Sequence, residues 1–131
     1  MKYELVRVKD IVDGLRWRAK ALKSFGKVKK GDLSGLIQNS NSISQKGRCW
    51  VFPDARMYGS SQIFDNAEMH DKARMFDDAE MRNNSKMFGN AKMYNSSIMY
   101  DKSKMFDDSV LGNRGVLQGK EELRGDDMVI L

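Results

Sequence analysis

The chain has 131 residues, of which 40% are hydrophobic and 31% charged, a composition typical of one small soluble domain. No run of eighteen apolar residues occurs, so the sequence predicts no membrane contact, and the N-terminus MKYELVRVKD shows no signal peptide. A single cysteine excludes an internal disulfide and fits a reducing cytoplasm. With one cysteine and one histidine, we expect no zinc site, no other metal and no cofactor.

Basic residues are concentrated in the N-terminal part of the chain, although the net charge is only +5. Residues 1–50 contain twelve Lys and Arg and four Asp and Glu, whereas residues 51–131 contain eleven and fourteen. Basic segments attract phosphates, so nucleic acid is one candidate partner of the first part. Docking onto the acidic remainder of the same chain, or exposure to solvent, are the alternatives.

The pattern of residues 1–48 predicts a β-hairpin followed by loops. The segments YELVRV and LRWRAKAL both alternate in polarity, and Asp13-Gly14 between them is a common turn dipeptide. In the second segment, basic side chains point to one side while Trp17 and its apolar neighbours point to the other. We expect this segment to pack on or cap the rest of the chain. Its basic side chains form the candidate nucleic-acid patch: Arg16, Arg18, Lys20, Lys27, Lys29 and Lys30.

Residues 49–123 form an internal repeat of six residues. A large aliphatic residue or methionine recurs at every sixth position from Val51 to Leu123. A small residue lies two positions before each except at Glu121, and Asp, Asn or Gly mostly follows two positions after. Residues six apart on a helix are rotated by roughly 600°, so this period does not suit a helix. It suits short strands with alternating faces, separated by two-residue corners.

Three such units close one triangular coil of eighteen residues, so the repeat predicts an all-β fold. We expect a single-stranded parallel β-helix of about four coils after the hairpin region, and a tail, residues 124–131, that caps it. Methionine fills a narrow interior well because its side chain is flexible. The spacing predicts three interior columns: Val51, Met69, Met87, Met105 and Leu123; Met57, Met75, Met93 and Leu111; Ile63, Met81, Met99 and Leu117.

Aromatic residues recur directly after the interior positions and are expected to point outward. At eighteen-residue spacing they predict three ladders: Phe52–His70–Phe88–Phe106, Tyr58–Phe76–Tyr94 and Phe64–Arg82–Tyr100. These side chains either stack on one another or form a partner surface, since contiguous exposed apolar patches commonly mark interfaces. They are the candidate partner-binding residues.

The spacing resembles the hexapeptide repeat of left-handed parallel β-helices, and the left-handed coil is implied by that resemblance. The segments GDLSG (31–35) and ISQKGRCWVF (43–52), followed by hexads, also resemble small β-helical proteins encoded by bacteriophages and prophages. The chain departs from them in its interior methionines and in Ser34, where glycine is common. The resemblance implies a mobile-element context, in the cytoplasm of a bacterial host.

The best-known hexapeptide-repeat proteins are acyltransferases that use a histidine base, and His70 is the only candidate here. It falls in an outward slot of an unbroken repeat, where no loop builds a pocket. We therefore expect a non-catalytic protein-interaction module, one form of which is an inhibitor of a host antiviral defence protein. We also expect the module to form a homo-oligomer, either a dimer or a trimer. The alternatives are a small acyltransferase using His70 and a nucleic-acid-binding protein using the N-terminal basic patch.

Overall fold

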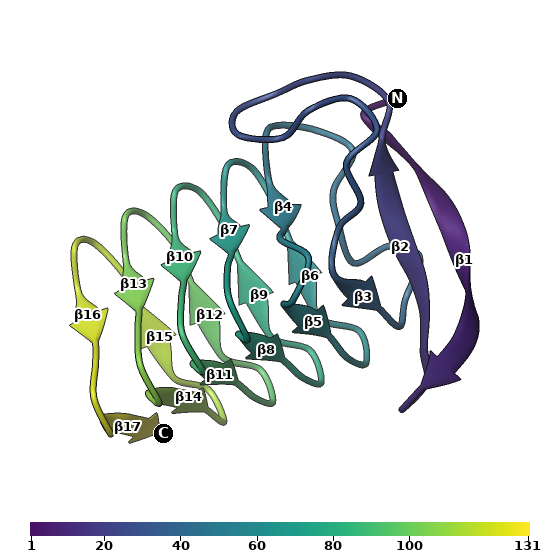
Figure 1. Ribbon diagram of the computed structural model, residues 1–131. Helices are drawn as coiled ribbons and strands as arrows, with labels where there is room; N and C mark the ends of the chain where they lie inside the picture. Colours follow the sequence, from purple (N-terminus) through teal and green to yellow (C-terminus); the bar gives the residue numbers. More distant parts are fainter.

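The computed structural model describes residues 1–131. An N-terminal hairpin is followed in the chain by a parallel β-solenoid of about five turns, and there are no helices (Figure 1). The all-β prediction is confirmed, but the number of coils exceeds the predicted four. The difference arises at both ends, because parallel pairing starts before residue 49 and continues beyond residue 123.

The first two strands are much longer than all later ones, and the third is as short as those of the repeat. These three strands are β1 (Tyr3–Val12), β2 (Leu15–Ala21) and β3 (Leu36–Ile37). Thirteen short strands then recur every six residues, and β17 (Met128–Ile130) ends the chain. The thirteen are β4 (Trp50–Val51), β5 (Arg56–Met57), β6 (Gln62–Ile63), β7 (Glu68–Met69), β8 (Arg74–Met75), β9 (Glu80–Met81), β10 (Lys86–Met87), β11 (Lys92–Met93), β12 (Ile98–Met99), β13 (Lys104–Met105), β14 (Val110–Gly112), β15 (Val116–Leu117) and β16 (Glu122–Leu123).

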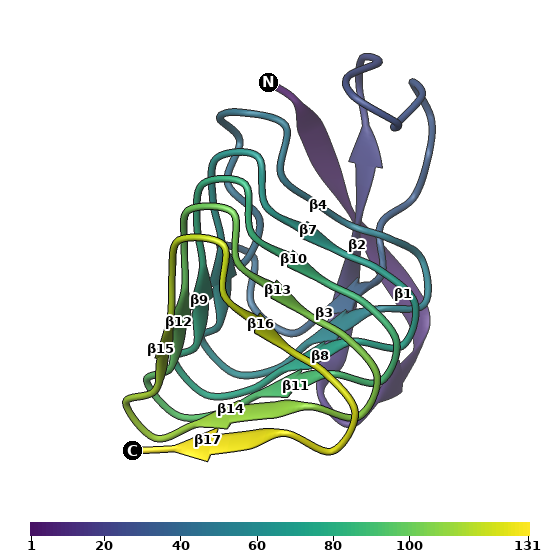
Figure 2. The ribbon, with the colours of Figure 1, turned by 90° about the vertical axis from the view of Figure 1, so that its left-hand side faces the viewer.

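These strands stack into three sheets, which form the three sides of a prism seen along its axis in Figure 2. The eight-stranded sheet has the order β1-β2-β3-β5-β8-β11-β14-β17. The five-stranded sheet has the order β16-β13-β10-β7-β4, and the four-stranded sheet has the order β15-β12-β9-β6. Successive parallel partners are eighteen residues apart, as Met69 and Met87 are. The predicted interior columns are therefore present.

The interior of the prism is filled by the predicted methionines and by the small residues that precede them. Met57, Met75 and Met93 have no exposed surface, and neither do Ala73 and Ala91 beside them. A small residue leaves room for the long methionine of the next side of the triangle, so the narrow core closes without large gaps.

The corners have left-handed backbone conformations, as the turn formers predict. Asp77, for example, has a φ of 58°, a conformation that Asp, Asn and Gly tolerate better than other residues. Its Oδ2 accepts a hydrogen bond from the backbone N–H of Asn95, one coil later, at 2.9 Å. The same bond joins Asp71 to Gly89 and Asp107 to Gly125. The corner side chains thus tie successive coils together.

The hairpin covers the N-terminal end of the prism (Figure 1). Strands β1 and β2 are antiparallel, with Tyr3 opposite Ala21, and β2 pairs with β3 through Trp17 and Ile37. Tyr3 and Ala21 belong to the same buried cluster as Trp50 of the first coil. The hairpin is therefore both an extension of one solenoid sheet and a cover for the core.

Parallel pairing begins within the segment assigned to residues 1–48, where β3 pairs with β5. Residues 124–131, where we expect a cap, contain β17, which pairs in parallel with β14 through Val129 and Leu111. The tail thus adds a further strand to the eight-stranded sheet.

Candidate functional site

The outer face of the eight-stranded sheet brings together cations from the hairpin and from the solenoid. Trp17 pairs with Ile37 and Ile37 with Met57, so Trp17 lies on the core side of the sheet. Because side chains alternate along a strand, the basic residues of β2 lie on the outer side. We call the outer cations the basic sheet face: Arg16, Arg18, Lys20, Arg56, Arg74 and Lys92.

Three of these cations form a continuous column. Arg56 is in register with Arg74, and Arg74 with Lys92, on neighbouring coils. Like charges placed directly opposite one another destabilise a sheet. Burial, and then the charge of Arg56, lower the pKa of Arg74, whose Nη1 donates to the carbonyl of Asp54 at 2.9 Å. The repulsion between these like charges therefore costs free energy, and a bound anion would reduce that cost.

The ladder Tyr58–Phe76–Tyr94 lies beside this column on the same face. The ring centroids of Tyr58 and Phe76 are 4.9 Å apart, and those of Phe76 and Tyr94 are 4.6 Å apart, with nearly parallel planes. The rings are half-buried, and their faces contact one another. The predicted stacking therefore occurs along this ladder.

The predicted ladder containing His70 lies on the five-stranded sheet. The His70 ring is stacked between Phe52, at 4.3 Å, and Phe88, at 5.0 Å, and Phe106 continues the stack at 5.3 Å from Phe88. Glu68 Oε1 lies 2.7 Å from His70 Nε2. Both faces of the imidazole are thus covered, and its one side-chain hydrogen-bond partner is the carboxylate of Glu68, two residues earlier in the same coil.

The third ladder, on the four-stranded sheet, is only partly a stack. The Arg82 guanidinium lies 4.4 Å from the centre of the Phe64 ring, a cation–π contact, and also binds Glu80 Oε2 at 2.9 Å. Tyr100 donates from its hydroxyl to Gln118 Oε1 at 2.5 Å. The three predicted ladders therefore lie on three different sides of the prism, and no one surface contains them all.

The predicted basic patch of the N-terminal segment is likewise divided. Arg16, Arg18 and Lys20 belong to the basic sheet face, and Arg18 Nη1 donates to the carbonyl of Ser34 at 2.7 Å. Lys27, Lys29 and Lys30 lie on the connection between β2 and β3, where Lys29 N–H binds Asp32. The basic residues of β2 and those of the following loop therefore do not form one continuous patch.

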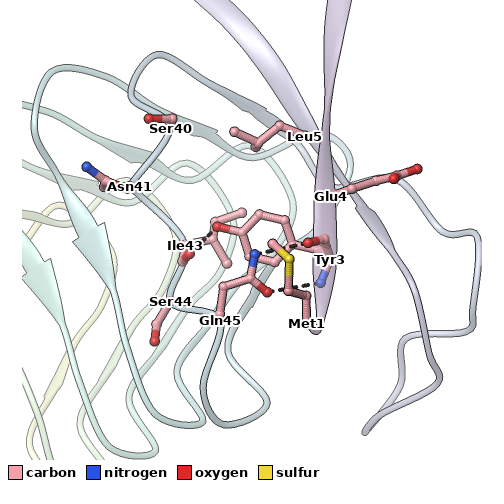
Figure 3. A pocket seen from close by; sticks show the side chains of 9 residues that line it. All are labelled: Met1, Tyr3, Glu4, Leu5, Ser40, Asn41, Ile43, Ser44 and Gln45. Atoms are coloured by element: carbon pink, nitrogen blue, oxygen red, sulfur yellow. Dashed lines mark hydrogen bonds between the residues drawn. The ribbon is translucent and has the colours of Figure 1, made fainter.

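A hollow of about 480 Å³ lies between the start of β1 and the loop before β4. Figure 3 shows Gln45 reaching the backbone of Tyr3, with Met1 beside them and Glu4 pointing away. Gln45 Oε1 accepts from the backbone N–H groups of Lys2 and Tyr3, and its Nε2 donates to the Tyr3 carbonyl. The Tyr3 hydroxyl donates to the Ile43 carbonyl. These bonds join β1 to the first coil, which makes the hollow a structural junction.

A buried lysine beside the single cysteine was not predicted. Lys2 is 2% exposed; its Nζ donates to the Cys49 carbonyl at 3.0 Å and lies 3.4 Å from Cys49 Sγ. Burial lowers the pKa of Lys2 and raises the pKa of Cys49. A thiol whose pKa is raised is a poor nucleophile, so the pair is suited to packing rather than to catalysis. The alternating pattern of β1 gives no signal for it, because Lys2 precedes that strand.

A comparison with models of protein families finds no match, and neither does a comparison with curated proteins. None of the chain forms a helix that is long and apolar enough to cross a membrane. No group of three or more His, Cys, Asp and Glu side chains is placed to hold a metal ion.

Proposed function

We propose that the protein is a non-catalytic interaction module that binds the acidic surface of a protein partner on the basic sheet face. The observation that carries this proposal is the aligned column Arg56–Arg74–Lys92 beside the Tyr58–Phe76–Tyr94 ladder. Arginine and tyrosine are enriched among the residues that dominate binding energies at protein interfaces. A rigid solenoid also loses little conformational freedom on binding.

The partner that we favour is a protein of a bacterial host, in line with the resemblance to phage-encoded β-helical proteins. An inhibitor of an antiviral defence component is the concrete form of that proposal. Self-association through the same face is disfavoured, because a symmetric contact would place the cationic column against its own copy. A dimer or trimer would instead need one of the other two aromatic ladders.

An acyltransferase is the weaker alternative. Phe52 and Phe88 cover both faces of the His70 ring, and Glu68 binds its Nε2. A base that must reach a substrate needs an accessible nitrogen within hydrogen-bond distance of it. An acyl-CoA assay of the wild type and of His70→Ala would decide the matter, since activity lost in that variant would overturn the interaction-module proposal.

The main test is capture of partners from a bacterial host lysate on immobilised protein, with quantitative mass spectrometry. We expect a captured protein with an acidic surface to be lost at least tenfold with Arg56→Gln/Lys92→Gln. The matched control is Lys102→Gln/Lys120→Gln, which removes the same charge from another side of the prism. Equal capture by all three proteins would contradict the proposal.

A further inference from the structure

A second cationic surface runs along the corner between the four-stranded and five-stranded sheets. The corner is formed by the arches that connect β6 to β7, β9 to β10, β12 to β13 and β15 to β16 (Figure 1). Three neighbouring hollows follow these arches, and Asn84 lines all three. Lys86 is shared by the first and second hollows, and Lys102 and Lys120 by the second and third. The hollows make one groove, which begins at the loop around Lys27 and ends at the last arch.

The eighteen-residue stacking places the cations of this groove in two adjacent columns. In the first column, on the arches, Lys102 N–H binds the Gly119 carbonyl of the next coil, which sets Lys120 beside Lys102. In the second, on the five-stranded sheet, Lys86 is in register with Lys104. Neighbouring coils are ~4.8 Å apart. Six cations line the groove: Lys27, Arg48, Lys86, Lys102, Lys104 and Lys120.

The carboxylates of the groove are already engaged by other groups. Glu68 binds His70 at 2.7 Å, and Glu122 forms an ion pair with Arg124. Asp101 accepts the backbone N–H of Gly119 at 2.9 Å. Lys102, Lys104 and Lys120 have no carboxylate within ion-pair distance, and Lys86 lies 3.9 Å from Glu68. The six cations exceed the three carboxylates that line the groove, so the groove has a net positive charge.

The composition of the groove differs from that of the basic sheet face. Five of the six groove cations are lysine, a compact charge suited to phosphate, and lysine is depleted at protein–protein interfaces. The amide side chains of Asn66 and Asn84 lie between the cations and offer both donors and acceptors. Evenly spaced cations on a narrow path fit a flexible chain of phosphates rather than a broad acidic surface.

We propose that this groove binds single-stranded nucleic acid through its phosphodiester backbone, with the asparagine amides available to sugar or base edges. The site differs from the N-terminal patch expected from the sequence, of which only Lys27 lines the groove. It is also independent of the basic sheet face, so either proposal can fail without the other.

The test measures binding by fluorescence anisotropy over a series of salt concentrations. The probes are a fluorescein-labelled oligo(dT) of twelve nucleotides and an oligo(U) of the same length. Single-strand binding through phosphates gives a slope of log K against log salt of about −0.7 per contact. We expect Lys102→Gln/Lys120→Gln to weaken binding at least tenfold at low salt and to reduce the slope by about 1.4, because two contacts are lost. Arg56→Gln/Lys92→Gln, which removes the same charge, should change the affinity by less than twofold and leave the slope unchanged.

Three results would overturn the proposal. The first is no binding of either oligonucleotide at low salt. The second is an equal loss in the two double variants, which would show attraction by net charge alone. The third is a lack of selectivity: a duplex of the same length binds as tightly as the single strand, or poly-glutamate competes as well as unlabelled oligo(dT). Either outcome would assign the groove to polyanions in general. Thermal unfolding of each variant controls for loss of structure.

Discussion

In the solenoid, each contact is repeated eighteen residues later, whereas at the junction between the hairpin and the first coil each contact occurs once. Met75 lies between Met57 and Met93, and Asp77 binds Asn95, as equivalent residues do in neighbouring coils. Lys2, Tyr3 and Gln45 have no such equivalents. A repetitive array distributes stability over many similar contacts, while a junction depends on a few. The two regions should therefore respond differently to substitution.

The largest effect is expected in the solenoid core. Met81→Ala leaves a cavity in an interior without exposed surface and should lower the free energy of unfolding by about 2–5 kcal/mol. Met81→Leu nearly conserves volume and should cost less than about 1.5 kcal/mol. Chemical denaturation measures both. If the cores of successive coils are equivalent, Met75→Ala should give a similar loss, and a much smaller loss at either site would contradict this uniformity.

The second effect tests the junction. A Cβ on Gly35 would overlap the Ala55 carbonyl oxygen and crowd that of Phe52 at 2.8 Å. Both are backbone atoms, which move only with their coil, so Gly35→Ala should cost about 3 kcal/mol. Thermal or denaturant unfolding measures the loss. Gly112→Ala is the control, because Gly112 also lies outside the left-handed region and its Cβ would meet only the Ile130 side chain, at 3.4 Å; an equal loss at both glycines would argue against crowding as the cause.

The third effect concerns the outer surface of the solenoid. Phe76 stacks on both Tyr58 and Tyr94, and each aromatic pair contributes about 0.5–1.5 kcal/mol beyond its buried area. Phe76→Leu keeps much of the apolar area and should cost about 1–2 kcal/mol in equilibrium unfolding. Phe106→Leu, at the end of its ladder, should cost about half as much because one stacked partner is lost. The reverse order would show that the number of stacked partners does not set the loss of stability.

The smallest effect is a pH-dependent one at the junction. The Tyr3 hydroxyl donates to the buried Ile43 carbonyl, so Tyr3→Phe should cost about 1 kcal/mol near neutral pH. Burial raises the pKa of Tyr3 from 10.0 to about 12. Because the folded state keeps the proton that the unfolded state releases, wild-type stability should fall as pH rises from 10 to 12. The unfolding midpoints of wild type and Tyr3→Phe should therefore converge above pH 10 and then cross before pH 12, and parallel curves would contradict the raised pKa.

Much of the solenoid could be predicted from sequence because the period of six imposes its geometry directly. The interior columns and the left-handed corners follow from one recurring pattern. The same pattern also reaches β17, since Val129 lies six residues after Leu123 and pairs with Leu111. The first coil was missed because Ile37 pairs with Met57, a separation two residues longer than in later coils. Those extra residues interrupt the period on which the prediction depended.

The candidate sites were less predictable than the fold. The sequence correctly indicates the stacking in two of the three ladders, since stacked partners there are eighteen residues apart. It does not indicate that Arg18 of the hairpin and Arg56 of the solenoid share one sheet face, because that depends on how β2 pairs with β3. The groove lysines follow the same eighteen-residue spacing, as in Lys102 and Lys120. They give no signal in the composition, because acidic residues outnumber basic ones in the second part of the chain.

The sequence by itself therefore determined the interior of this protein, because a repeat that alternates small and large residues can close in only a few ways. Only the tertiary structure decided its surface. Which charges lie side by side depends on the three sheets, on the two extra residues of the first coil and on the pairing of the hairpin. These features join residues that are far apart in the chain and follow no common period. Within each proposed binding surface, the cations of one column follow the eighteen-residue spacing, as Arg56 and Arg74 do, whereas the tertiary structure decides which columns lie next to one another.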